Sequence, residues 1–181
     1  MTFRASQARS RRSPPTSRGT VVASGNFDFA RPARDWREGR SKDWMLIRLD
    51  RCLGKSLGFV ELGVDQAFGF DPADAPVSSA GFPSDQRLPD TLVLDPACRI
   101  RGGNFREWMH DCAALPGNSG SPLFQEVRSG GRVRLVVVAM VTCGEQAGAA
   151  RAYDNATANR ATKMAYILPA IAGFLERPPA R

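Results

Sequence analysis

Short apolar runs, separated by glycine, proline and polar turn residues, recur along most of the chain. The clearest run, residues 44–49, is apolar at almost every position and predicts a strand that is buried on both faces. The same pattern predicts further short strands at residues 20–23, 57–62, 78–81, 91–94, 98–101 and 164–168. No apolar run approaches the roughly 20 residues that a membrane-spanning helix needs.

A hairpin is the most legible supersecondary unit. Residues 123–127 and 132–141 predict two strands, and residues 129–131, Ser-Gly-Gly, favour a tight turn between them. Near the C-terminus, Pro169 stands at a position that is typical of a helix start. Many short strands with one terminal helix predict an all-β protein, either a barrel or a sandwich.

The formal net charge of +7 is unevenly distributed. Residues 1–42 hold ten Lys and Arg against three Asp and Glu, whereas residues 43–181 hold fifteen of each. The excess positive charge therefore belongs to the N-terminal segment. We expect a solvated basic arm there and no specific nucleic-acid partner, since no basic-aromatic motif of a known nucleic-acid module is present. The same segment holds no apolar stretch of the kind that marks a signal peptide.

Cysteine and histidine usage limits the chemistry. The chain has four cysteines, Cys52, Cys98, Cys112 and Cys143, without a C-x-x-C pair, and one histidine, His110. This set is too poor in ligands for a zinc site, so we predict neither a metal nor a cofactor. From the count alone, two disulfides in an oxidising compartment and free buried thiols are both open.

One segment carries candidate chemistry. Residues 116–122, Pro-Gly-Asn-Ser-Gly-Ser-Pro, place Ser119 between glycines directly before an apolar strand. A serine that attacks a carbonyl needs an exposed hydroxyl and backbone N–H groups for the oxyanion. Gly117 can adopt the backbone that aims its N–H at that oxygen, and Gly120 leaves room for a substrate. A plain turn is the alternative. An α/β-hydrolase elbow is excluded because Ser121 stands where that motif has glycine, and because a strand follows.

Two blocks of the sequence resemble a known family. Residues 110–112, His-Asp-Cys, together with residues 116–123 closely resemble the active-site loop of trypsin-like (chymotrypsin-fold) serine peptidases, in their bacterial glutamyl-endopeptidase-like branch. Residues 42–50 are similar to the second signature of that branch, in which an aspartate, here Asp43, precedes an apolar strand. The resemblance extends over roughly residues 20–175.

The resemblance implies two six-stranded β-barrels with a catalytic cleft between them, the first barrel being incomplete in this chain. By position, Ser119 is then the nucleophile, and the N–H groups of Gly117 and Ser119 form the oxyanion hole. Asp43 is the carboxylate that orients a histidine and stabilises its imidazolium.

A disulfide between Cys98 and Cys112, bracing the active-site loop, is also implied, while Cys52 and Cys143 stay unassigned. The chain then divides into a basic flexible arm or remnant of an early strand region (1–19), a partial first barrel (20–70), a linker (71–77), a second barrel with the nucleophile loop (78–168), and a C-terminal helix and tail (169–181).

The general base of the family has no counterpart before Asp43. In the family a histidine block stands some 40 residues ahead of the aspartate, which falls at residues 1–3 here. His110 stands nine positions before Ser119, and we expect it to be structural rather than the base. Two explanations stay open: the natural start lies further upstream, or the chain is a remnant that kept the fold and lost the chemistry.

We therefore expect a serine-type endopeptidase that acts on peptide or protein substrates through an acyl-enzyme, weak or inactive as the chain is written. The alternative is a non-catalytic homologue that binds peptides or proteins. The expected protein is a monomer without a membrane span, secreted or periplasmic if its true start lies upstream. Residues 140–144 lack the histidine that glutamyl peptidases place in their substrate pocket, which argues against a preference for glutamate.

Overall fold

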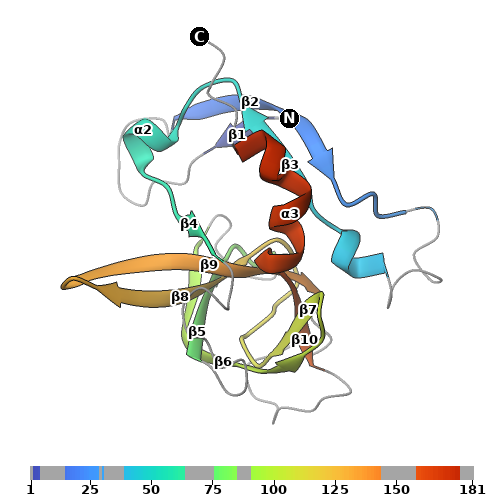
Figure 1. Cartoon of the computed structure of the whole chain (residues 1–181), viewed down its shortest axis with the longest axis vertical. Coiled ribbons are helices and arrows are strands. Elements are labelled where there is room, and N and C mark those ends of the chain that lie inside the picture. The colour runs from blue at the N-terminus through green and yellow to red at the C-terminus, as the bar shows by residue number, and fades with distance from the viewer. Residues whose placement is uncertain are drawn as a thin grey trace.

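Two β-sheets and a C-terminal helix make up the structure, a computed structural model that describes residues 2–4, 15–28, 30, 39–63, 76–84, 91–143 and 158–175. One sheet closes into a barrel and the other stays open, and the helix α3, Met164–Leu175, lies between them (Figure 1). Within these ranges, no helix is long and apolar enough to cross a membrane.

Six antiparallel strands form the barrel. In chain order they are β5 (Pro76–Gly81), β6 (Val93–Gly103), β7 (Glu107–His110), β8 (Pro122–Ser129), β9 (Arg132–Cys143) and β10 (Asn159–Lys163). Their hydrogen-bonded order is β10-β7-β6-β5-β8-β9, and β9 also pairs with β10, which closes the barrel. A short strand, β4 (Glu61–Leu62), pairs in parallel with β9.

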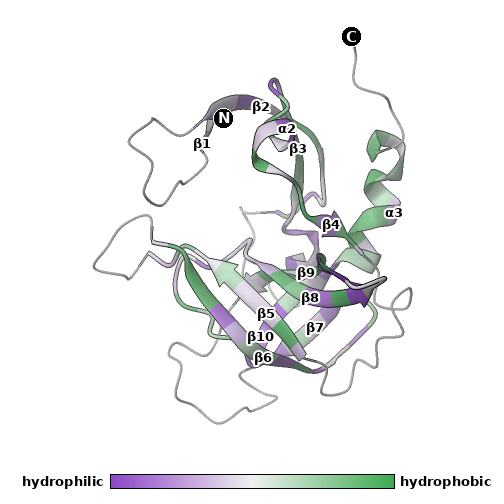
Figure 2. Cartoon of the chain, turned by 90° about the vertical axis from the view of Figure 1, so that its left-hand side faces the viewer, coloured by the Kyte–Doolittle hydropathy of each residue, from purple (hydrophilic) through white to green (hydrophobic). Residues whose placement is uncertain are grey.

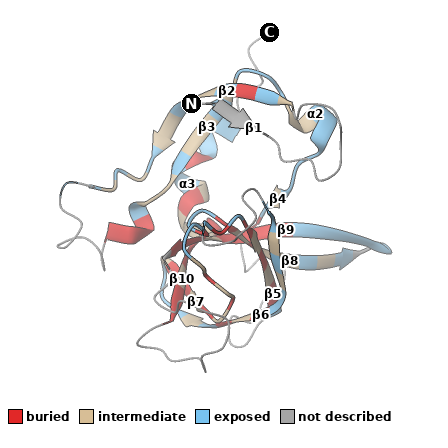
Figure 3. Ribbon diagram, turned by 180° about the vertical axis from the view of Figure 1, so that it is seen from behind, coloured by how far each residue is buried: buried red, intermediate tan, exposed pale blue. Residues whose placement is uncertain are grey.

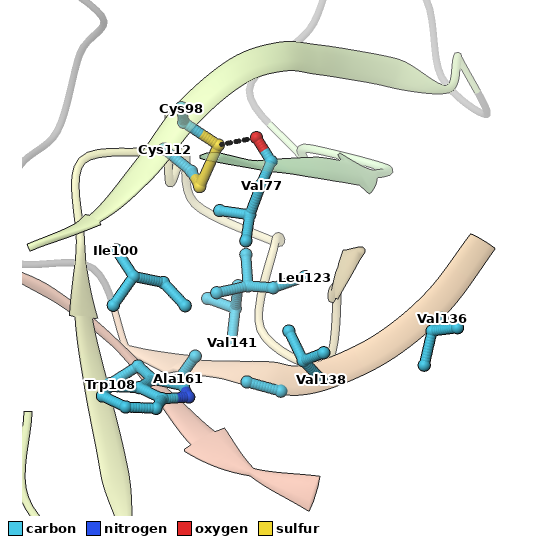
Figure 4. Close-up of a cluster of buried hydrophobic side chains, with 11 residues drawn as sticks. Val77, Cys98, Ile100, Trp108, Cys112, Leu123, Val136, Val138, Val141 and Ala161 are labelled. Carbon is cyan, nitrogen blue, oxygen red and sulfur yellow. Dashed lines mark hydrogen bonds between the residues drawn. A yellow bond between two sulfur atoms is a disulfide. The ribbon is translucent and has the colours of Figure 1, made fainter. Parts of the chain in front are cut away.

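Alternating residues of these strands fill the barrel interior, because successive side chains of a strand point to opposite faces. Apolar and polar residues accordingly alternate along several strands (Figure 2). Leu123 is fully buried, and Figure 4 shows the side chains of Val77, Ile100 and Val141 around it. The remaining members of this core are Cys98, Trp108, Cys112, Val136, Val138, Ala139 and Ala161.

The predicted hairpin is confirmed. Strand β8 pairs along its whole length with residues 132–140 of β9, from Pro122 opposite Met140 to Ser129 opposite Arg132. Gly130 and Gly131 form the connection with φ values of 57° and 74°. Two successive positive φ values suit a tight type I′ turn, and only glycine adopts both at little cost.

The second sheet has three strands in the described part of the chain: β1 (Thr2–Arg4), β2 (Thr16–Ser24) and β3 (Met45–Leu49), with β2 in the middle. The strand predicted at residues 44–49 is therefore confirmed, but its predicted burial on both faces is wrong. Met45 is 52% exposed, and no residue of β3 is fully buried (Figure 3). The physical reason is that the three strands described for this sheet do not close around a core of their own.

The region predicted as a strand at residues 164–168 is the first part of α3, so that prediction is wrong. Met164, Ile167 and Ile171 recur at helical spacing and pack against Val137 of β9, which favours the helix over an isolated strand. Pro169 lies inside α3, not at its start. Residues 57–62, also predicted as one strand, form the end of the helical turn α2 (Gly54–Leu57) and then β4.

Two strands of the barrel, β7 and β10, were not predicted from the sequence. Two strands that were predicted separately form one continuous strand, β6. Strands β7 (Glu-Trp-Met-His) and β10 (Asn-Arg-Ala-Thr-Lys) are short, and neither has the alternation of apolar and polar residues that predicts a strand. The strands predicted at residues 91–94 and 98–101 form the continuous strand β6, whose register shifts near Pro96. The predicted linker lies mostly outside the described residues, and its last two residues, Pro76 and Val77, open β5.

Candidate active site

The segment between β7 and β8 is held from several sides. The disulfide between Cys98 and Cys112 joins its start to β6, which confirms the predicted pair. The N–H of Ala113 donates to a carboxylate oxygen of Asp95 at 2.8 Å. Further along, the carbonyl of Pro116 accepts a bond from the N–H of Ser84 at 2.8 Å. These contacts fix the path of the chain up to the candidate nucleophile.

Ser119 is exposed near the end of this segment, and the backbone N–H groups around it differ in whether they have hydrogen-bond partners. The N–H groups of Asn118, Gly120 and Ser121 donate to the carbonyls of Leu115, Val141 and Asn118 at 3.0, 2.7 and 2.9 Å. Among the described residues, the N–H groups of Gly117 and Ser119 have no hydrogen-bond partner. Within the described part of the chain, two donors spaced two residues apart, one of them on the serine itself, therefore have no internal acceptor.

Two glycines give the loop its shape. Gly117 and Gly120 have φ values of +92° and +86°, a backbone region that favours glycine. A Cβ on Gly117 would also lie 2.6 Å from the backbone nitrogen of Ser84. The sequence motif thus needs glycine at residue 117 both for conformation and for space.

Asp43 is the C-cap of the short 3-10 helix η1 (Arg40–Lys42), and its N–H donates to the carbonyl of Arg40 at 3.0 Å. Its side chain is half-buried, and in the described part of the chain it has neither a hydrogen-bond nor an ion-pair partner. Desolvation by burial raises the pKa of this carboxyl above its ordinary value. A partly desolvated carboxylate without a partner can accept a hydrogen bond from an incoming donor.

Both candidate residues are anchored near the same strand. The serine loop is tied to the end of β9, since Gly120 donates to the carbonyl of Val141, and the N–H of Val141 donates to the carbonyl of Ser121. Trp44, which follows Asp43, packs against the cluster that contains Val137 of β9. No hydrogen bond joins Ser119 directly to Asp43 or His110 within the described ranges.

His110 lies inside the barrel. It is 0% exposed and stands in β7 opposite Ile100 on one side and Asn159 on the other. Burial lowers its pKa to about 4, although the backbone of Arg160 and the carboxylates of Asp111 and Asp95 favour the charged form. A fully buried, neutral imidazole packs the core, while Ser119 faces solvent.

Several residues that support the site were not predicted. Asn159 of β10 donates from Nδ2 to the carbonyl of Cys112 at 2.8 Å, and Arg40 forms an ion pair with Glu107. Such contacts join residues that are far apart in sequence, so no local sequence pattern predicts them. Cys52 is an exposed free thiol, and the side chain of Cys143 lies outside the described part of the structure. Across the described residues, no group of three or more His, Cys, Asp or Glu side chains gathers as a metal site would require.

No family model and no curated protein matches the sequence. Among solved structures, the chain is similar to HBP, a chymotrypsin-fold protein known from an atomic resolution structure. The TM-score is 0.67 at 17% sequence identity, and the match covers 99% of this chain and 77% of that one. The closed barrel, the C-terminal helix and this likeness define a trypsin-like fold, which confirms the predicted fold class. The likeness concerns the fold alone.

Proposed function

We propose that this chain carries the nucleophile and the oxyanion-binding half of a serine-type endopeptidase site. The observation that carries the proposal is the pair of N–H groups on Gly117 and Ser119, which have no hydrogen-bond partner among the described residues and lie beside an exposed serine hydroxyl. The N–H groups of Asn118, Gly120 and Ser121 donate to carbonyls within the fold, in contrast to those of Gly117 and Ser119. Preorganised donors of this kind stabilise the oxyanion of a tetrahedral intermediate.

In this proposal the Oγ of Ser119 attacks the carbonyl carbon of a peptide bond. The carbonyl oxygen becomes an oxyanion that accepts hydrogen bonds from Gly117 and Ser119. Expulsion of the amine leaves an acyl-enzyme on Ser119, and water then releases the acid. An imidazole would take the proton of Ser119 during the attack and pass it to the leaving amine. Asp43 would orient that imidazole, and its partly desolvated carboxylate, which has no partner among the described residues, supports this role.

The base itself is the missing element. His110 is fully buried in the barrel, and the chain has no second histidine. Loss of the base from a catalytic triad lowers the rate by about 10⁴-fold or more, so we propose that this chain by itself is weak or inactive. The same observation favours a second candidate function, a non-catalytic homologue that binds peptides at the unpartnered N–H groups.

A disulfide is typical of proteins from oxidising compartments, and Cys98–Cys112 therefore supports a secreted or periplasmic location. The proposed protein acts on peptides or proteins as a monomer, with no cofactor. Its membership of the glutamyl-endopeptidase-like branch rests on the two sequence blocks alone.

Covalent labelling with a fluorophosphonate tests the proposal. The full chain is treated with the probe in the presence and absence of excess imidazole, which supplies the absent base, and the labelled residue is mapped by mass spectrometry. We expect imidazole-dependent labelling of Ser119 that disappears in Ser119→Ala and persists in Ser56→Ala, a control at another exposed serine. If imidazole produces no labelling at Ser119, the peptidase proposal is wrong. Binding of a peptide without any labelling would then favour the second candidate.

A further inference from the structure

A buried ion pair joins the open sheet's side of the molecule to the barrel. Arg40 of η1 donates from Nε to Oε1 of Glu107, in β7, at 2.9 Å. The two side chains are 8% and 5% exposed. Arg40 and Ser41 of η1 are buried, whereas no residue of the following strand β3, labelled in Figure 3, is fully buried. A charged pair removed from water in this way is costly unless both partners stay matched.

At one end, the pair controls the backbone that carries Asp43. The carbonyl of Arg40 accepts the N–H of Asp43 at 3.0 Å, which closes the 3-10 turn. Ser41, between them, is 1% exposed. The position of Arg40 against the barrel therefore fixes the position of the Asp43 backbone.

At the other end, Glu107 is held rigidly by the barrel. Glu107 pairs with Thr162 of β10 in the sheet. Its N–H donates to Oδ1 of Asn104 at 2.9 Å, and its carbonyl accepts the N–H of Asn104, also at 2.9 Å. The carboxylate that meets Arg40 is thus part of a well-bonded hairpin.

The open sheet cannot supply this rigidity, since in the described residues it has three strands and buries only Ser17 fully. We propose that Arg40 and Glu107 are positioning residues, which lock Asp43 onto the closed barrel. The inference rests on the proposed function of Asp43 as the carboxylate of the site. Trp44 packs beside the same junction and supplies the apolar part of the contact.

The test removes the pair without leaving a buried charge. Arg40→Met combined with Glu107→Leu replaces it by apolar side chains of similar size, an exchange that commonly preserves stability. Glu107→Gln alone is the single variant, and Arg40→Lys is the conservative one. Glu61→Gln is the matched control, because Glu61 pairs with Arg134 at 2.8 Å and joins β4 to β9 with both side chains more than 40% exposed.

Two readouts are measured on the full chain. The first is amide hydrogen exchange at Asp43, and the second is imidazole-supported fluorophosphonate labelling of Ser119, resolved into the maximal rate and the half-saturating probe concentration. We expect the double variant to stay folded by circular dichroism. Amide exchange at Asp43 should become faster and the maximal labelling rate of Ser119 should fall, each on the order of tenfold or more. The half-saturating concentration should not change, because the probe itself meets Ser119. Arg40→Lys should recover part of both effects, and Glu61→Gln should match the wild type.

Unchanged exchange at Asp43 in a folded double variant would overturn the inference. If the double variant does not fold, exchange at Asp43 in Glu107→Gln relative to Glu61→Gln decides, and equal rates contradict the positioning role. If the wild type is never labelled, the proposed function fails, while the exchange experiment still decides whether the ion pair holds Asp43.

Discussion

The closed barrel and the open three-stranded sheet are built from similar antiparallel strands, yet among the described residues only the barrel encloses a buried interior. Ile100, Leu123 and His110 are completely removed from solvent in the barrel. In the sheet, by contrast, Met45 and Val21 are about half exposed, at 52% and 50%. The barrel therefore holds the Ser119 loop by its own bonds, whereas Asp43 depends on contacts that reach across to the barrel. The two candidate catalytic residues differ in what keeps them in place.

The largest expected difference between the two regions is in core truncation. Leu123→Ala should lower the free energy of unfolding by roughly 3 to 5 kcal/mol, because it leaves a cavity in a filled core. Met45→Ala removes a half-exposed side chain and should cost less than about 1 kcal/mol. Urea unfolding followed by circular dichroism measures both. Similar losses of unfolding free energy in Leu123→Ala and Met45→Ala would contradict the difference in burial between the barrel and the open sheet.

The disulfide is the next largest contribution. Cys98 and Cys112 are 14 positions apart, and opening a loop of this size should cost about 3 kcal/mol. We expect this loss when both cysteines are changed to alanine, measured by the same unfolding experiment. Cys52→Ala is the control and should have little effect, since that thiol is free and exposed. A double variant as stable as the control would show that the disulfide does not brace the barrel.

His110 should make the barrel sensitive to acid. Its pKa is lowered to about 4 in the folded protein from the usual 6.5, because burial disfavours the charged form. The unfolded chain therefore binds a proton at a higher pH than the folded chain does. Stability should be complete above about pH 6.5 and should fall as the pH is lowered toward 4, by up to roughly 3 kcal/mol. Unfolding free energies at a series of pH values measure this slope, which His110→Leu should flatten. An unchanged slope in that variant would contradict the assignment.

The smallest expected effect concerns the loop glycines. Gly120 has a positive φ but open space around it, so Gly120→Ala should cost about 1 kcal/mol through backbone strain alone. Gly117→Ala should cost more, because its Cβ would also meet the backbone of Ser84. Thermal unfolding of the two variants compares them. Equal shifts would show that the loop adjusts freely at residue 117.

Local patterns in the sequence were sufficient to predict some elements of this structure. Glycine pairs and apolar runs predicted the β8–β9 hairpin, and the family resemblance predicted both the fold and the Cys98–Cys112 disulfide. Strand β6 replaces two strands that the sequence predicts separately, at residues 91–94 and 98–101, with Pro96 between them. In the structure, that proline lies where the pairing with β5 shifts register, a place where a strand tolerates proline.

Other features depend on contacts that no local pattern contains. The apolar residues 164–168 suit either a strand or a helix, and packing against β9 selects the helix. The burial of β3 depends on whether its sheet closes. Arg40 and Glu107 are 67 positions apart, so their pairing requires the folded barrel. At the candidate site, the sequence indicated Ser119, Gly117 and Asp43 but not the residues that hold them.

The central claim is that the N–H groups of Gly117 and Ser119 form an oxyanion hole beside an exposed nucleophile. Nuclear magnetic resonance of the backbone amides, recorded while a peptidyl boronic acid is added to the full chain, tests it most directly, because the boronate presents a tetrahedral oxygen to the donors. We expect large downfield shifts of the Gly117 and Ser119 amide protons and small changes at Asn118, Gly120 and Ser121, which already have partners. Boronate binding that leaves the Gly117 and Ser119 amides unshifted would contradict it.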